Sequence, residues 1–153
     1  MTEASIRSAR LEDAGRIADW QVAMAMETEG RPLDRQRVGR GVSRALQDPA
    51  RGRYLVVEDD GEAVGSLLLT REWSDWRDGW FWWIQSVYLE PRARGKGHYG
   101  RLYAHVVEEA RADPDVRGVR LYVETENEHA RRVYTALGMP ETSYRLHELD
   151  FDA

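Results

Sequence analysis

The residues most able to do chemistry in this chain form a basic, glycine-rich turn. Positions 85–100 read QSVYLEPRARGKGHYG, a β-type run that breaks into the turn and then opens a helix. Such a turn directs unpaired backbone N–H groups and the positive end of a helix dipole at one point, which suits a phosphate. Lys96, with Arg92 and Arg94 nearby, adds positive charge. The turn therefore predicts a ligand that carries phosphate.

Two other nucleotide-binding loops share part of this pattern. The glycines of the turn spell G-x-G-x-x-G, and Glu124 closes the next predicted strand, as in a dinucleotide-binding fold. However, residues 91–94 separate the strand from the first glycine, and the 29 residues after Glu124 are too few for the remaining strands of that fold. A Walker-type loop is excluded because Gly97, and not Ser or Thr, follows Lys96.

Composition limits the class of protein. A length of 153 residues suits a single domain, here 1–153, and a net charge of −5 argues against a broad nucleic-acid-binding face. With no cysteine, disulfides and an acyl-cysteine intermediate are excluded, and the four histidines lack the spacing of a metal site. No apolar run reaches the roughly 18 residues of a membrane span, and no signal peptide is evident. We expect a cytoplasmic protein with no metal and no nucleic-acid or membrane partner.

The elements that position the turn follow from hydrophobic periodicity. Apolar residues at helical spacing predict a helix over 11–26 and a weaker one over 38–46. The strongest helical pattern runs over 99–110, directly after the turn. Asn127 suits the N-cap of a last helix, which Gly138 should end.

Strands are predicted between these helices. They cover 4–9, 54–58, 63–71, 80–89, 119–124 and 143–151. Asp60-Gly61 suits a hairpin turn between the second and third of them, and the long apolar run at 80–89 should be central. The alternation predicts an α/β layer structure with a mixed sheet.

Two blocks of the sequence resemble the Gcn5-related N-acetyltransferases. The first reads VYLEPRARGKG over 87–97, and the second contains LYVE at 121–124, Asn127, Ala130, Tyr134 and LGM at 137–139. The resemblance, which spans roughly 80–140, implies a seven-stranded mixed sheet that splays between strands four and five, flanked by about four helices. It also implies acetyl-coenzyme A as the cosubstrate, lodged in the opening.

By the same resemblance, cosubstrate contacts fall on the end of the long strand, on the turn and on the last helix. They are Val87, Tyr88, Leu89, Arg94, Gly95, Lys96, Gly97, His98, Tyr99, Gly100 and Asn127. The strand residues would offer main-chain partners to the pantetheine arm, and the turn would hold the pyrophosphate. Tyr99 stands where the family usually has Gly or Ala, so we expect its side chain to turn toward the core.

Tyr134 is the residue that the resemblance directs at the sulfur of the cosubstrate. Attack of an amine on a thioester needs a proton for the departing thiolate, and a phenol, with a reference pKa of about 10, carries one at pH 7. A helix-face tyrosine can equally pack like Val133 or Leu137. Without cysteine, we expect direct transfer in a ternary complex.

The general base is not fixed by any motif. Gln85 stands where some polyamine-acetylating relatives carry a glutamate, and an amide cannot take a proton. Glu27 and Glu29, between the first two predicted helices, and Glu72 are the candidates. Their shared negative charge favours a small-molecule amine that is cationic.

Five of the six tryptophans lie within 73–83. They either pack on the core or on a second copy of the chain in a homodimer, or they wall the acceptor site and attract a cationic amine. Strand alternation puts Trp83 on the face of Gln85 and Val87, so we expect Trp83 and Gln85 to contact the acceptor.

The sequence thus predicts an acetyl-coenzyme A-dependent N-acetyltransferase that acts on a primary amine. Two alternatives stay open. One is a non-catalytic acyl-coenzyme A binding or sensing module of the same fold, which Gln85 supports. The other is an acetyltransferase that acts on protein N-termini or lysines.

Overall fold

The computed structural model describes residues 4–152, which form two compact units divided after Leu121. The first unit holds the sheet of β1 (Ala4–Ser8), β2 (Arg53–Asp59), β3 (Glu62–Ser74), β4 (Gly79–Leu89) and β5 (Val116–Leu121). It also holds α1 (Ala14–Glu29), α2 (Arg35–Gln47) and α3 (His98–Ala112), and the short 3-10 turns Leu11–Asp13 and Pro91–Ala93. The second unit contains α4 (Glu128–Ala136). Within the part of the chain that is described, no helix combines the length and the apolar character needed to cross a membrane.

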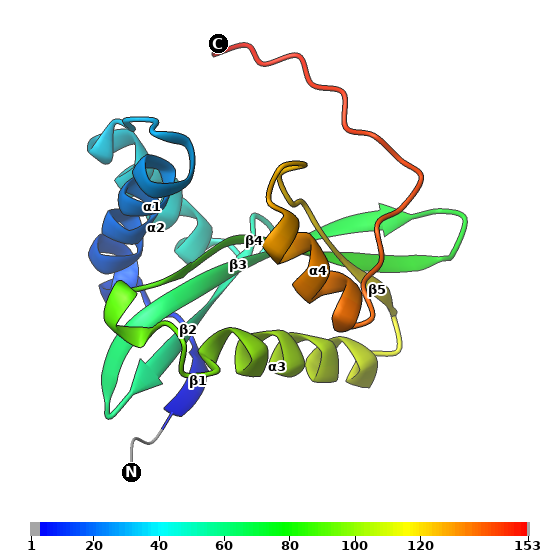
Figure 1. The fold of residues 1–153 in the computed structure, drawn as a ribbon, viewed down its shortest axis with the longest axis horizontal. Helices are drawn as coiled ribbons and strands as arrows, with labels where there is room; N and C mark the ends of the chain where they lie inside the picture. The colour runs from blue at the N-terminus through cyan, green and yellow to red at the C-terminus, as the bar shows by residue number, and fades with distance from the viewer. Residues whose placement is uncertain (1–3, 153) are drawn as a thin grey trace. The chain divides into compact units, whose positions relative to one another are not determined.

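The sheet is mixed, as predicted, with strand order β1-β2-β3-β4-β5. β1 to β4 pair antiparallel with one another, whereas β5 runs parallel to β4. The parallel pairing ends at Ile84↔Leu121, so β5 does not pair with Gln85 to Leu89, of which Gln85, Tyr88 and Leu89 pair with β3. Beyond Leu69, β3 continues with β4 as a hairpin that extends past β2 (Figure 1).

The expectation of seven strands was wrong, because the sheet of the described residues has five. The predicted strand 143–151 does not form a strand, and β5 ends at Leu121, so the last residues of the predicted strand 119–124 lie outside it. The spacing of the apolar residues explains why the predicted strand at 143–151 does not form. Tyr144 and Leu146 alternate on one face of an extended chain, but Leu149 and Phe151 fall on the other, so no single face can be buried.

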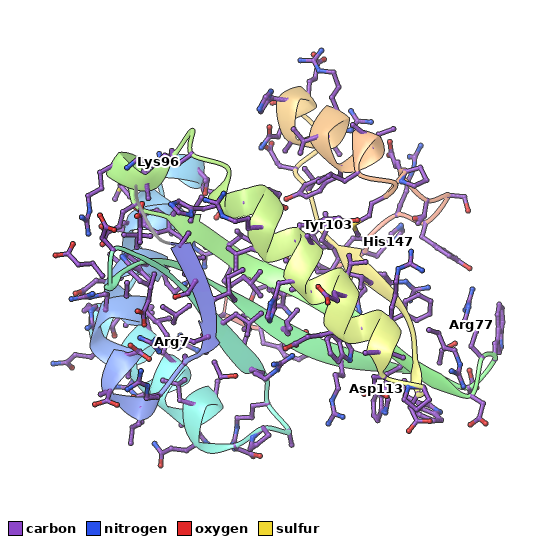
Figure 2. The ribbon with its side chains drawn as sticks, turned by 90° about the horizontal axis from the view of Figure 1, so that it is seen from below. Arg7, Arg77, Lys96, Tyr103, Asp113 and His147 are labelled. Carbon is purple, nitrogen blue, oxygen red and sulfur yellow. The ribbon has the colours of Figure 1, made fainter. Side chains whose placement is uncertain are left out.

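The helices follow the predicted pattern closely. Gly30 ends α1 in the left-handed region at φ +61°, and the Asp34 carboxylate caps α2 by accepting from the Gln36 and Arg37 amides. In the second unit, the Asn127 side chain caps α4 and Gly138 follows it at φ +88°. Figure 2 shows Lys96 at the start of α3 and Asp113 at its end.

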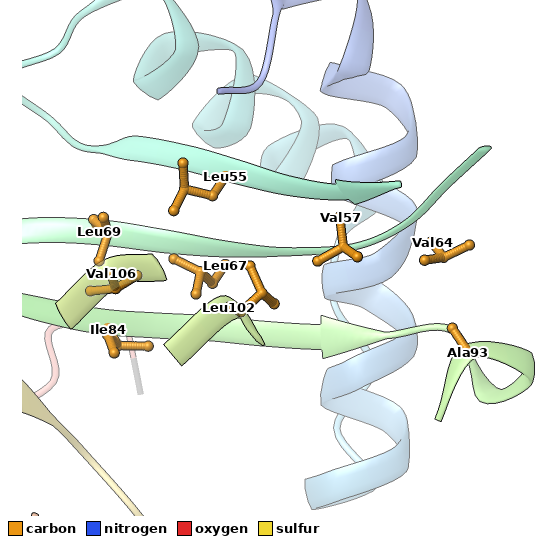
Figure 3. Packing of buried hydrophobic residues seen from close by; sticks show 9 residues of the cluster. All are labelled: Leu55, Val57, Val64, Leu67, Leu69, Ile84, Ala93, Leu102 and Val106. Atoms are coloured by element: carbon orange, nitrogen blue, oxygen red, sulfur yellow. The ribbon is translucent and has the colours of Figure 1, made fainter. Parts of the chain in front are cut away.

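Two hydrophobic clusters hold the first unit together, one on each face of the sheet. The cluster under α3 consists of Leu55, Val57, Val64, Leu67, Leu69, Ile84, Ala93, Leu102 and Val106 (Figure 3). The cluster under α1 and α2 consists of Ile17, Ala18, Trp20, Val42, Tyr54, Val56, Ala63 and Tyr88. Because β4 contributes to both clusters, its position, and that of the turn after it, is fixed from both sides.

Candidate functional site

The glycine turn connects β4 to α3 with backbone conformations that favour glycine. Gly95 and Gly97 have φ of +76° and +83°, a region that costs residues with a Cβ atom free energy. Gly97 is the N-cap of α3 and no side chain caps the helix, an arrangement that suits an anion at a helix N-terminus. A Cβ atom on Gly95 or Gly100 would meet nothing within 4 Å, so the turn faces open space.

Basic groups surround this turn. Lys96 is half exposed, with its Nζ 3.8 Å from Asp59 Oδ2. Arg101 on α3 donates from Nη2 to the Lys96 carbonyl at 3.0 Å. The sequence reasoning did not single out Arg101. The signal was available, because a residue four positions after an N-cap lies directly over the first turn of its helix.

His98 anchors the turn instead of reaching into it. Its side chain is only 2% exposed, with Nε2 3.1 Å from Asp59 Oδ2 and Nδ1 2.8 Å from Arg101 Nη2. Because a guanidinium can only donate, Nδ1 accepts and the Nε2–H donates to Asp59. The predicted role of His98 in binding therefore rests on its main-chain N–H. Tyr99, expected in the core, is only half-buried, since His98 takes the first buried position of α3.

β4 contains a bulge just before the residues predicted to bind the pantetheine arm. Its register with β3 jumps from Leu68↔Gln85 to Ser66↔Tyr88, and Ser86 lies at φ +53°. The extra residue reverses the alternation. Trp83 and Gln85 share the α1 and α2 face with Tyr88, whereas Val87 packs under α3, so the prediction that Val87 shares their face was wrong. The Gln85 amide donates to Thr70 Oγ1.

The main chain of β3 lies very close to this part of β4. A Cβ atom at Gly65 would lie 2.4 Å from the Tyr88 carbonyl oxygen, closer than packed atoms can approach. In addition, the Glu90 N–H donates to the Val64 carbonyl at 2.8 Å. The main chain of Tyr88 to Glu90 is therefore held in place by β3.

The structure brings Glu27 to two of the predicted cosubstrate residues. Tyr88 Oη donates to Glu27 Oε1 at 3.3 Å, and Arg94 Nη2 lies 2.8 Å from Glu27 Oε2. Arg94 also donates from Nε to the Leu89 carbonyl at 3.0 Å and lies 5.5 Å from the centre of the Tyr88 ring. Burial, together with the negative charge of Glu27, raises the pKa of Tyr88.

The other two candidate bases have different surroundings. Glu29 is the exposed last residue of α1. Glu72 on β3 forms an ion pair with Arg120 on β5, whose guanidinium lies 3.6 Å from the centre of the Phe81 ring. A carboxylate held by a guanidinium has to separate from it before it can accept a proton from an amine.

The tryptophan-rich hairpin packs partly on itself and partly, through Trp82, on the cluster under α3. The Trp73 and Trp80 rings meet edge to face, with centroids 4.9 Å apart, and Arg71 lies 4.6 Å from the Trp80 ring. Trp76 near the tip is 85% exposed. Arg77, at this tip, lies at the opposite end of the first unit from Lys96 (Figure 2).

Two predicted site residues belong to the second unit. The Asn127 side chain accepts from the Ala130 amide at 3.1 Å, so its oxygen serves the helix. Tyr134 is half-buried on α4, and its carbonyl accepts from the Met139 amide at 2.8 Å.

The residues of the first unit fit a nucleotide-type diphosphate. An uncapped helix N-terminus, two left-handed glycines and the cations of Lys96 and Arg94 converge on one turn. The strand that leads to it has main-chain groups without a β5 partner, which suit an amide-containing arm. No group of three or more metal-binding side chains occurs within residues 4–152.

The family model described as the acetyltransferase (GNAT) family matches residues 16–139. The crystal structure of a possible acetyltransferase from Clostridium difficile 630 is 39% identical, matches over 96% of this chain and 97% of that one, and has a TM-score of 0.91.

Two structures at 18% identity share the fold. A predicted acetyltransferase with acetyl-CoA from Clostridium acetobutylicum matches over 97% of this chain and 96% of that one, with a TM-score of 0.77. A ribosomal-protein-alanine N-acetyltransferase from Brucella melitensis biovar Abortus 2308 matches over 97% and 100%, with a TM-score of 0.76. No curated protein sequence gives a significant match.

Proposed function

The chain belongs to the acetyltransferase (GNAT) family, and we propose that it transfers the acetyl group of acetyl-coenzyme A to a primary amine of a small molecule. The observation that carries this proposal is the uncapped N-terminus of α3, which follows Gly95 and Gly97 in left-handed conformations. Backbone amides arranged in this way bind a diphosphate without any need for side-chain recognition.

In this proposal, the first unit holds the cosubstrate. The amides of residues 97–100 and the Lys96 ammonium would hold the diphosphate. The main chain of Val87 and Leu89 would pair with the amides of the pantetheine arm, along the edge of β4 that β5 leaves open. Gly65 would allow β3 to approach closely and support β4 from the other side.

The chemistry would be a direct transfer. The bound cosubstrate supplies a thioester, and the acceptor nitrogen forms the new C–N bond as the C–S bond breaks. The proton lost by the amine passes to a carboxylate, for which Glu27 is the candidate, and the departing thiolate takes a proton from Tyr134. Both oxygen atoms of Glu27 face partners from β4 and the turn, so this carboxylate lies beside the residues proposed to bind the cosubstrate.

The acceptor is proposed to be a small cationic amine. Glu27 and Glu29 end α1 with two carboxylates, which attract ammonium groups. Trp83 and Gln85 share the sheet face toward α1 and α2 and would line the acceptor site.

The test is thiol release from acetyl-coenzyme A with a panel of amines and a panel of peptides. We expect release with small polyamine-like molecules, and little with peptides. Tyr134→Phe should slow release without changing the affinity for acetyl-coenzyme A in calorimetry. Tyr144→Phe, which removes the hydroxyl of an exposed tyrosine in the C-terminal segment, is the matched control.

Other outcomes favour the alternatives. Binding of acetyl-coenzyme A without thiol release from any acceptor would indicate a sensing module, consistent with the Gln85 amide held by Thr70. Release only with peptides would indicate a protein acetyltransferase. No binding heat would contradict the proposed function itself.

A further inference from the structure

The Arg94 guanidinium already has several partners within the protein. Its guanidinium pairs with Glu27 Oε2 at 2.8 Å and donates to the Leu89 carbonyl at 3.0 Å. It also lies over the Tyr88 ring. Two of these partners belong to the strand proposed to bind the pantetheine arm, so Arg94 covers the site that it is proposed to serve.

The Glu27 carboxylate likewise has partners within the protein. Tyr88 Oη donates to Oε1 and Arg94 occupies Oε2, so both carboxylate oxygens have donors. An amine that approaches Glu27 would have to compete with the Arg94 guanidinium. In this arrangement, Glu27 is available neither to orient a cationic acceptor nor to take a proton from it.

The Glu27–Arg94 pair is built so that it can exchange partners. The side chains are 41% and 47% exposed, so water screens the pair and little free energy is needed to separate it. A guanidinium binds phosphate oxygens through paired N–H donors as well as it binds a carboxylate, and a diphosphate brings more negative charge.

We propose that Arg94 masks Glu27 until the cosubstrate binds, and that the transfer of Arg94 from Glu27 to the diphosphate frees the carboxylate that receives the acceptor amine. This inference rests on the proposed function. Tyr88 keeps its hydrogen bond to Oε1 and holds Glu27 in place after Arg94 leaves. The cosubstrate therefore binds first, and the acceptor site becomes complete only afterwards.

The direct test is calorimetric titration of acetyl-coenzyme A into the wild type and Glu27→Gln. Removal of the competing charge should tighten binding roughly two- to fivefold, the range that an exposed ion pair supports. Arg94→Gln should weaken binding. Glu108→Gln, which neutralises an exposed carboxylate on α3, is the control and should leave the affinity unchanged.

A second titration isolates the diphosphate. S-acetylpantetheine lacks it, so Glu27→Gln should gain no affinity for this fragment. Equal or weaker binding of acetyl-coenzyme A by Glu27→Gln would overturn the masking role, because it would mean that Glu27 leaves Arg94 unhindered or positions it for the ligand. If the wild type gives no binding heat at all, the proposed function fails, and this result differs from the failure of the masking role.

Turnover provides an independent readout. With an amine that the wild type accepts, Glu27→Gln should bind acetyl-coenzyme A more tightly and yet release thiol more slowly. If Glu27→Gln binds acetyl-coenzyme A more tightly but releases thiol at the wild-type rate, Arg94 masks Glu27 but Glu27 takes no part in the reaction. This result contradicts the second half of the proposal.

Discussion

The buried imidazole of His98 donates to the buried carboxylate of Asp59 across 3.1 Å, joining the first turn of α3 to the end of β2. The side chains are 2% and 9% exposed. Lys96 approaches the same carboxylate oxygen at 3.8 Å. The proposed diphosphate turn is thus attached to the sheet by a buried polar contact, and not by its own glycines.

Asp59→Ala should therefore act on both stability and binding. It leaves the His98 Nε2–H buried without an acceptor, which costs about 1–3 kcal/mol of unfolding free energy. Because the start of α3 loosens, the affinity for acetyl-coenzyme A should also fall. Urea denaturation and calorimetry measure the two effects, with exposed Glu108→Ala as the baseline. An unchanged unfolding free energy in Asp59→Ala would show that the His98–Asp59 contact does not stabilise the fold.

Gly65→Ala should destabilise the fold although it adds one methyl group. The new Cβ would lie 2.4 Å from the Tyr88 carbonyl oxygen and 3.1 Å from Leu89 Cα, so the main chain of β4 has to shift. Overpacking of this kind costs about 1–3 kcal/mol, and the shift should weaken cosubstrate binding.

Gly41→Ala is the matched control for that substitution. Gly41 lies in α2 with nothing within 4 Å of an added Cβ, so alanine should stabilise the helix by about 0.5–1 kcal/mol. Thermal unfolding of both variants provides the comparison. Opposite shifts of Tm are expected, and shifts of the same sign would contradict the close approach of β3 and β4.

Acid should weaken the fold through Asp13. Arg7 donates to both of its carboxylate oxygens, at 2.8 and 3.0 Å, and these hydrogen bonds lower the pKa of Asp13. A carboxyl group with a lowered folded pKa stabilises the protein above its unfolded pKa, and that stabilisation is lost as pH falls through the folded value.

The loss from Asp13 should therefore begin near pH 4 and continue below it. Arg7→Gln should be less stable at neutral pH and lose less stability on acidification. Denaturation midpoints at a series of pH values measure this, and parallel pH profiles for the two proteins would argue against it.

The C-terminal segment should promote self-association. Leu149 and Phe151 are 82% and 93% exposed, and apolar side chains gathered in this way are typical of interaction surfaces. We expect the wild type to form a dimer and Leu149→Ser with Phe151→Ser to shift it toward the monomer. Light scattering after gel filtration reports the mass, and a monomeric wild type would rule out this role.

The sequence predicted those turns and helix ends whose conformation depends on residues close together in the chain. The turn at 95–100, the Asn127 cap and Gly138 were all readable, because backbone conformation and capping depend on neighbouring residues. The bulge at Ser86 was not. Serine carries no signal for φ +53°, and the bulge follows from how β3 pairs with β4.

The sequence also could not predict which charged and polar side chains of the site pair with one another. Glu27 and Arg94 are 67 positions apart, and His98 and Asp59 are 39 apart, so only the folded chain brings them together. The sequence predicted Glu27 and His98 as site residues but not which residues each one contacts. Tyr134 and Asn127 keep their proposed roles on the strength of the resemblance.

The end of the β4–β5 pairing at Ile84 has a consequence for how a ligand is selected. Peptide groups at an open strand edge cannot stay dry and unpaired, so solvent hydrates them until an arm with its own amides displaces it. Such an arm is read by the spacing of peptide units, as an added strand would be. Ligand selection should therefore not depend on the side chains of Val87 and Leu89, which pack against the cluster under α3, whereas any change that bends the backbone there should weaken binding.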